Sequence, residues 1–207
     1  MKVLLTGFEP FGKHAVNPSQ KLINELPDTL DDDIVLIKTV LPVDQASATR
    51  DLLFQLHHHQ PDVAICFGLA SGRSRICLER VAINLMDFQI PDNDGVKISE
   101  APIIENGPAA YFTNLPISDL LSTLLDEGIQ ARISLTAGAF LCNLVFYSLM
   151  HEIETSQLPT KAGFIHLPPL PEQAALSDKS TPSLSLEKDV LSALLIIKFL
   201  YQNLTSK

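Results

Sequence analysis

The sequence predicts an α/β protein: a single-domain three-layer α/β/α sandwich around a twisted, mostly parallel (mixed) sheet. Its 207 residues, 46% of them hydrophobic, suffice for one sizeable core, so we expect one domain over residues 1–207. Short apolar segments rich in β-branched residues alternate with longer segments of helical spacing. The short segments are apolar almost throughout, as strands are when helices cover both faces of a sheet.

The expected elements follow from this alternation. Buried strands are predicted at residues 2–7, 33–41, 62–68, 131–136 and 162–167, and helices at residues 18–26, 45–58, 117–127, 142–153 and 185–204. Residues 73–87 alternate only in part, which favours a more exposed strand or hairpin added to the sheet. Ligands of such sheets collect at the carboxyl ends of the strands, so the site is expected there.

Two further segments lack periodicity. Residues 88–108 are rich in proline, glycine, asparagine and aspartate and predict a loop of about twenty residues, long enough to suggest a functional role. Residues 177–183 predict a polar connector before the last helix.

Charge and cysteine content limit the classes of binding partner and the cellular compartment that we expect. A net charge of −9 gives no broad positive field, so nucleic acid and anionic membrane surfaces are disfavoured and a small molecule or peptide fits better. The apolar runs at 3–5 and 190–200 are too short for a signal sequence and a membrane span, respectively. Three cysteines, an odd number with no close metal-binding pair, suit a reducing cytoplasm, so we expect a cytoplasmic protein.

Cys142 is the candidate nucleophile. It follows the predicted strand 131–136 and the small-residue turn 137–139, which places it near the first turn of a helix. Unpaired N–H groups and the helix dipole favour a thiolate there. Free cysteines are also among the most buried residue types, so an inert core residue is the alternative interpretation.

A base and an orienting group for such a nucleophile are available. His166 ends the predicted strand 162–167 just before two prolines, at the edge where neighbouring strands end. Glu79 lies in an otherwise apolar stretch, where a buried carboxylate must be paired or hydrogen-bonded. A structural histidine, and a structural pair between Glu79 and Arg80 or a solvated strand face, are the competing interpretations.

Two other motifs point away from phosphate and metal chemistry. The segment TGFEPFG at residues 6–12 lacks the spacing of a dinucleotide or phosphate-binding loop, and its Phe8 and Phe11 could wall a flat apolar pocket or belong to the core. The three adjacent histidines at 57–59 cannot all converge on one ion, and they favour a helix end. We therefore expect no metal and no cofactor.

Several long motifs occur in order along nearly the whole chain: LLTGFEPFG with NPS, ERVAINLMDFQIPDNDG, ENGPAAYFTNLPI, TAGAFLCN and AGFIHLP. Together they closely resemble the pyroglutamyl peptidase type I, or pyrrolidone-carboxylate peptidase, family. The resemblance implies an α/β/α sandwich and a cytoplasmic thiol protease. Such a hydrolase removes the N-terminal pyroglutamyl residue from peptides, generally unless proline follows, and often assembles as a homotetramer.

The resemblance also assigns roles. It implies Cys142 as nucleophile, His166 as general base and acid, and Glu79 as the group that orients His166. Phe8 and Phe11 match ring-stacking positions, and further pocket positions are matched by Asn17, Ile90, Phe140 and Leu141.

The chain departs from the family pattern at two positions. Gln89 stands where relatives often carry arginine, and Leu69 stands where some carry glutamine. The weaker donor at Gln89 supports an alternative, a catalytically impaired homologue that binds lactams or pyroglutamyl peptides. A nucleoside phosphorylase or a similar α/β enzyme is a third interpretation, without a phosphate motif to support it.

Overall fold

Seven strands form the central sheet of the computed structural model, which describes residues 1–176 and 182–204. Their order across the sheet is β2-β3-β1-β4-β9-β5-β8. The strands are β1 (Lys2–Phe8), β2 (Thr29–Leu30), β3 (Ile34–Leu41), β4 (Val63–Leu69), β5 (Ile76–Glu79), β8 (Ala131–Ser134) and β9 (Lys161–Leu167). Strands β3, β1, β4 and β9 are parallel, so β1, β4 and β9 end at one edge. Strand β5 is antiparallel to β9 and parallel to β8, which makes the sheet mixed.

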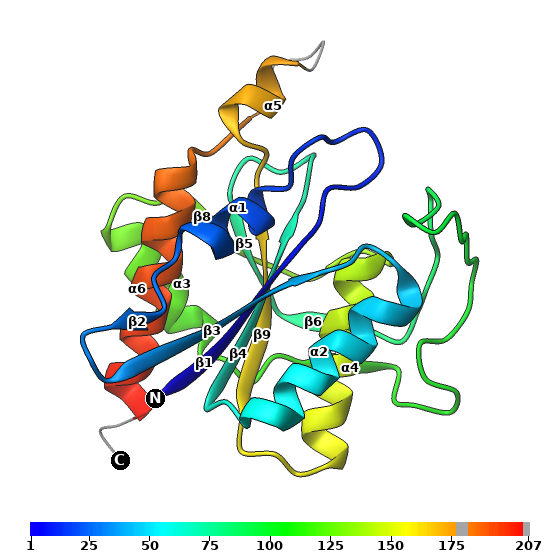
Figure 1. Cartoon of the computed structure of the whole chain (residues 1–207), viewed down its shortest axis with the longest axis horizontal. Coiled ribbons are helices and arrows are strands. Elements are labelled where there is room, and N and C mark those ends of the chain that lie inside the picture. The colour runs from blue at the N-terminus through cyan, green and yellow to red at the C-terminus, as the bar shows by residue number, and fades with distance from the viewer. Residues whose placement is uncertain (177–181, 205–207) are drawn as a thin grey trace.

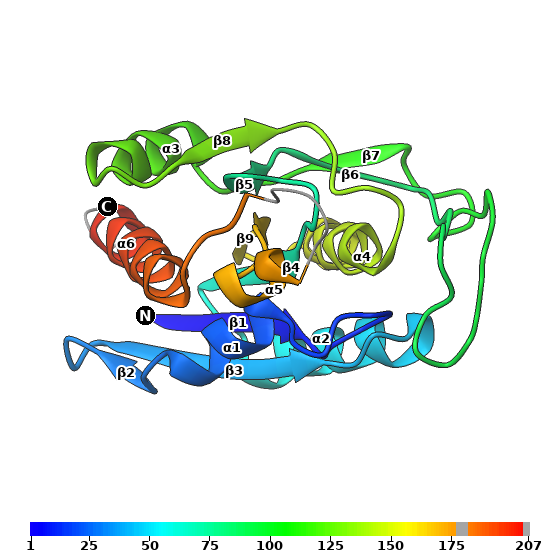
Figure 2. The ribbon, with the colours of Figure 1, turned by 90° about the horizontal axis from the view of Figure 1, so that it is seen from above.

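Helices cover both faces of this sheet, so the predicted α/β/α sandwich is confirmed (Figures 1 and 2). One face carries α2 (Gln45–His59) and α4 (Leu141–Thr155), and the other carries α1 (Pro18–Glu25), α3 (Ile117–Asp126) and α6 (Leu186–Leu204). Side chains alternate along each strand, and two apolar cores result, one on each face. On β4, Ala64 and Cys66 face α4, whereas Val63, Ile65 and Phe67 face the opposite core.

The five predicted strands and five predicted helices are all present, with ends displaced by a few residues. Three short elements were not predicted: β2, the strand β7 (Ala110–Phe112) and the helix α5 (Pro171–Ala175). Elements of two to five residues give too few positions for a period to be recognised.

The prediction for residues 73–87 is wrong in one respect. Strand β5 is fully buried between β9 and β8, not an exposed addition to the sheet. The following strand β6 (Val81–Ile83) leaves the sheet and pairs with β7 in a separate two-stranded sheet. Polar residues such as Glu79 suggested exposure, but its carboxylate is buried against polar partners instead.

The remaining sequence predictions concern connections and helix ends. Residues 88–108 contain no helix or named strand, as predicted. His57, His58 and His59 end α2, and Nε2 of His57 lies 2.9 Å from a carboxylate oxygen of Glu152. Within the predicted connector, residues 177–181 lie outside the described residues. Across residues 1–176 and 182–204, no helix is both long and apolar enough to span a bilayer.

Candidate active site

Glu79 and His166 meet across neighbouring antiparallel strands. Glu79 pairs with Phe164 and Cys77 with His166, so Glu79 and His166 are diagonal neighbours on one face of the sheet. Long side chains can bridge such a diagonal. Nδ1 of His166 lies 2.8 Å from Oε1 of Glu79, and both residues are buried, with exposed fractions of 4% and 0%.

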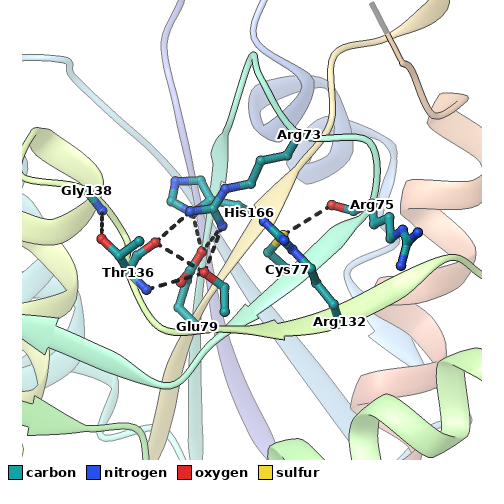
Figure 3. Close-up of polar contacts among 9 residues, drawn as sticks. Arg73, Arg75, Cys77, Glu79, Arg132, Thr136, Gly138 and His166 are labelled. Atoms are coloured by element: carbon teal, nitrogen blue, oxygen red, sulfur yellow. Dashed lines mark hydrogen bonds and ion pairs between the residues drawn. The ribbon is translucent and has the colours of Figure 1, made fainter.

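Arg73 holds the carboxylate from the other side (Figure 3). Its Nη1 donates hydrogen bonds to Oε1 of Glu79 and to Oγ of Ser134, and its Nη2 donates to the carbonyl oxygen of Thr136 at 2.6 Å. Thr136 belongs to the turn that leads to Cys142. One guanidinium therefore ties the carboxylate to the segment that carries the candidate nucleophile.

These contacts fix the charge state of the pair. Burial by itself raises the pKa of Glu79, but its hydrogen bond with His166 and the charge of Arg73 outweigh burial and hold that pKa below its ordinary value. Burial lowers the pKa of His166, and the partly compensating Glu79 does not reverse this. At neutral pH the carboxylate is ionised and the imidazole neutral. Because a carboxylate can only accept, Nδ1 carries the proton and Nε2 keeps a lone pair for a substrate or a thiol.

Cys142 lies on the same face as His166. Gly68 of β4 pairs in register with His166 of β9, and paired residues point to the same side of a sheet. A Cβ atom on Gly68 would lie 2.8 Å from Sγ of Cys142 and equally close to the ring of Phe164. The thiol thus occupies the space that the missing side chain of Gly68 leaves beside the imidazole.

The start of α4 sets the surroundings of this thiol. Phe140 is the N-cap residue and offers no side-chain hydrogen bond to the helix, so the first backbone N–H groups of α4 are available to an oxyanion. Gly138 makes the preceding turn possible, since its φ of +83° is one that side-chain-bearing residues rarely adopt. Burial, and after it the charge of Glu79, raise the pKa of Cys142 to about 12. The helix start alone suggested a stabilised thiolate, but burial dominates here and the thiol is protonated at neutral pH.

An apolar cavity opens on Cys142. Four of the predicted pocket residues line it, namely Phe8, Phe11, Asn17 and Phe140. Val43 and Leu69 complete its wall. The rings of Phe11 and Phe140 are 6.0 Å apart, and Phe88 meets Phe140 edge-on at 4.8 Å. The cavity measures about 20 Å³, room for about one water molecule. A ring-sized molecule would therefore fit only if these side chains moved apart; Phe11 and Phe140 are half-buried, whereas Phe8 is 3% exposed.

The other three predicted pocket residues do not line this cavity. Leu141 is buried in the core at 1% exposure. Ile90 is 43% exposed and lies over Gly12, where its Cδ1 is 3.6 Å from the position of a Cβ atom. Gln89 is exposed, and its amide makes no hydrogen bond to any residue within 1–176 or 182–204.

The long loop at 88–108 braces the cavity. Asn93 donates its backbone N–H to the carbonyl of Val43 at 2.8 Å and its side-chain amide to the carbonyl of Pro10 at 3.0 Å. Asp92 accepts from the backbone of Gln45 at the start of α2. The loop therefore contacts both Val43 and the segment that carries Phe11. A loop of this length can reach both sides of the cavity.

Comparison with known proteins shows which family has this sequence and fold. The sequence model of the pyroglutamyl peptidase family matches residues 1–202. The chain belongs to the pyroglutamyl peptidase family. The pyrrolidone-carboxylate peptidase of Vibrio vulnificus (strain YJ016) is 45% identical over 186 residues, 90% of this chain and 86% of the relative. That of Thermococcus kodakarensis is 43% identical over 206 residues, 99% of this chain and 98% of the relative.

Solved pyroglutamyl peptidase structures agree with the fold. A mutant pyrrolidone carboxyl peptidase from the hyperthermophile Pyrococcus furiosus is 40% identical and superposes with a TM-score of 0.95, covering 99% of this chain and all of that chain. Pyroglutamyl peptidase I of Bacillus amyloliquefaciens, 42% identical, superposes with a TM-score of 0.89 and covers 94% of each chain.

Three residues of this candidate site were not singled out from the sequence. Arg73 lies six positions before Glu79 and was one of several arginines in that segment, so no local signal marked it. Gly68 ends an apolar run, and its importance depends on a helix far along the chain. Val43 lines the cavity, and its carbonyl accepts a hydrogen bond from the distant Asn93, a contact that no local sequence pattern marks.

Proposed function

We propose that this chain is a pyroglutamyl peptidase, a cysteine exopeptidase that hydrolyses the bond after an N-terminal pyroglutamyl (5-oxoproline) residue, generally unless proline follows. The observation that carries the proposal is the position of the Cys142 thiol over Gly68, the register partner of His166, which is itself hydrogen-bonded to Glu79. Membership of the family, at 40–45% identity to named relatives, supports the same activity.

The first half of the reaction follows from the charge states. Nε2 of His166 accepts the thiol proton as Sγ of Cys142 attacks the acyl carbonyl carbon, so no free thiolate is required beforehand. The carbonyl oxygen becomes an oxyanion next to the unpaired N–H groups at the start of α4. His166 then gives its proton to the departing amine, the C–N bond breaks and a thioester remains. Glu79 stabilises the transient imidazolium at 2.8 Å.

The second half repeats these steps with water. Nε2 of His166 takes a proton from water, the hydroxyl oxygen attacks the thioester carbon, and the C–S bond breaks as the sulfur recovers a proton from His166. Pyroglutamic acid leaves and the neutral pair is restored. The hydrogen bond with His166, and to a smaller extent the charge of Arg73, lower the pKa of Glu79, so this carboxyl remains ionised through the cycle.

Selectivity rests on the cavity walls. Phe8, Phe11 and Phe140 offer apolar surfaces for a flat uncharged ring. Asn17 has one amide hydrogen bonded to the carbonyl of Glu9 and a second that can face the lactam oxygen. A free N-terminal glutamate would bring an unpaired ammonium into this apolar space, at a cost of several kcal/mol.

Hydrolysis of a pyroglutamyl peptide amide tests the proposal. The purified protein should release pyroglutamate and the free amine, Cys142→Ser should abolish release, and Cys77→Ser should retain it, because Cys77 faces Arg132 rather than the cavity. Absence of product from the wild-type protein would overturn the proposal.

A homologue that only binds lactams is the second candidate, and Gln89 is its support. The exposed Gln89 amide supplies no charged donor near the site. Binding of 5-oxoproline without turnover of any pyroglutamyl amide would favour this candidate. We also expect a cytoplasmic homotetramer, carried over from the family, and a mass measurement in solution tests the assembly.

A further inference from the structure

A second hollow lies next to the loop that carries Phe11. It measures about 320 Å³ and lies between residues 13–16 and helix α5; its walls are Lys13, His14, Ala15, Val16, Glu172, Gln173 and Leu176. We propose that this hollow binds the side chain of the residue that follows pyroglutamate, and that it favours an apolar side chain there. The inference rests on the proposed function and adds a second specificity site to it.

The course of the chain places the hollow next to the leaving group. His166 must give its proton to the departing amine, so the rest of the peptide lies on the His166 side of the scissile bond. Strand β9 carries His166 and ends at Leu167, and the chain then runs through Leu170 into α5, beyond the carboxyl end of β9 (Figure 1). Helix α5 therefore flanks the exit of the peptide.

The hollow and the ring cavity share one loop as a wall. Phe11 and Asn17 line the cavity at Cys142, whereas His14 and Val16 line the hollow. The rings of Phe11 and His14 are 5.5 Å apart, and the backbone N–H of His14 donates to the carbonyl of Phe11. A peptide with its first residue against Phe11 thus meets this loop again with its second residue.

The two walls are held together before any peptide binds. Gln173 accepts from the backbone N–H of Leu170 and donates from Nε2 to the carbonyl of Val16, both at 3.0 Å. Glu172 forms an ion pair with Lys21 of α1, also at 3.0 Å. Pre-formed walls reduce the ordering cost of binding.

The chemistry of the lining indicates the occupant. Ala15, Val16 and Leu176 present aliphatic surface, and Leu176 is 89% exposed. The carboxylate of Glu172 is already engaged by Lys21. An apolar side chain entering here would cover Leu176, which favours residues such as leucine over glycine or aspartate after pyroglutamate.

Dipeptide amides provide the test, because pyroglutamyl-Leu-NH₂, -Gly-NH₂ and -Glu-NH₂ differ only at the residue in question. We expect Leu176→Ala to lower kcat/KM for the leucine amide about fivefold and to leave the glycine amide unchanged. Leu176→Lys should raise the ratio of glutamate to leucine amide hydrolysis. Phe54→Ala, a change at another exposed apolar residue on α2, is the control and should alter none of these values.

The outcomes separate the two proposals. If the wild-type protein hydrolyses none of the three amides, the peptidase function fails and the subsite with it. If it hydrolyses all three but Leu176→Ala and Leu176→Lys change them in equal proportion, or not at all, the function stands and the subsite is overturned.

Discussion

The thiol of Cys142 occupies the space where Gly68 lacks a side chain. The two residues are 74 positions apart (142 − 68), yet a Cβ atom on Gly68 would lie 2.8 Å from Sγ. Because Gly68 and His166 are register partners, this contact places the thiol of the candidate nucleophile on the same face of the sheet as His166, the candidate base. The geometry of the candidate site therefore depends on a residue that contributes no functional group.

Replacement of Gly68 by alanine should displace the thiol. The added methyl group would overlap both Sγ of Cys142 and the Phe164 ring, so we expect kcat to fall about 10- to 100-fold, as misplacement of a reacting atom by about an ångström can cause. Steady-state hydrolysis of a pyroglutamyl amide measures this. Gly72→Ala, at a glycine with open space around it, should keep wild-type kcat. Wild-type turnover by Gly68→Ala would contradict the geometry.

Arg73 should act as a positioning residue for Glu79. Its charge lowers the pKa of both Glu79 and His166, so Arg73→Gln should move the acid limb of the pH–rate profile to higher pH, toward the ordinary histidine value, and reduce kcat about tenfold or more. The wild-type limb should lie below pH 6.5, because burial lowers the pKa of His166.

Two variants check this interpretation of Arg73. Arg73→Lys keeps the charge, but a lysine cannot contact Glu79, Ser134 and Thr136 at once. Its acid limb should therefore lie close to that of the wild type, whereas its kcat should remain reduced. Arg75→Gln, at an exposed arginine whose side chain points away from Glu79 (Figure 3), should resemble the wild type. An unshifted acid limb in Arg73→Gln would show that Arg73 has only a structural role.

Alkylation of Cys142 should be slow at neutral pH and accelerate with alkalinity. Burial raises the pKa of this thiol to about 12, so the thiolate fraction should grow about tenfold for each pH unit from 7 to 10. The rate of inactivation by iodoacetamide measures it. Cys142→Ser identifies the labelled residue, since Cys66 is 1% exposed and its pKa is also raised to about 12. A rate that is flat from pH 7 to 10 would mean a pre-formed thiolate.

The sequence predicted the main elements because each is long enough to display its period. It also predicted the candidate residues Cys142, His166 and Glu79, chiefly through motifs that resemble a family. It could not predict that β5 is an interior strand, since polar Glu79 looks exposed until its buried partners on other elements are known. Register between strands is a property of two segments, and one segment alone does not contain it.

The environment of Cys142 shows a second limit. A helix start is a local feature, and it suggested a stabilised thiolate. Burial against Phe164 and the neighbouring carboxylate of Glu79 are tertiary features, and they raise the pKa of the thiol instead. Val43 likewise lines the cavity and accepts a hydrogen bond from the distant Asn93. For a site assembled from several elements, the sequence can therefore identify the residues, but it does not predict their pKa values, because these depend on tertiary contacts.

Asp189 should make stability depend on pH. It lies in the first turn of α6 with 0% exposure, and neither carboxylate oxygen has a hydrogen-bond partner within the described part of the chain. Burial raises its pKa to about 8 from an ordinary 3.8. The folded protein therefore keeps this proton between those values while the unfolded chain releases it, so the contribution of Asp189 to stability is full below pH 3.8 and is lost as pH rises toward 8.

Asp189→Asn removes this titration and should become more stable relative to the wild type as the pH rises. The difference in unfolding free energy between variant and wild type should grow by up to about 3 kcal/mol from pH 5 to pH 8. Urea unfolding at each pH measures it. Asp119→Asn, the same change at an exposed carboxylate in the first turn of α3, should show no such growth. A constant difference between Asp189→Asn and wild type across this range would mean that Asp189 is ionised in the folded protein and would contradict the prediction.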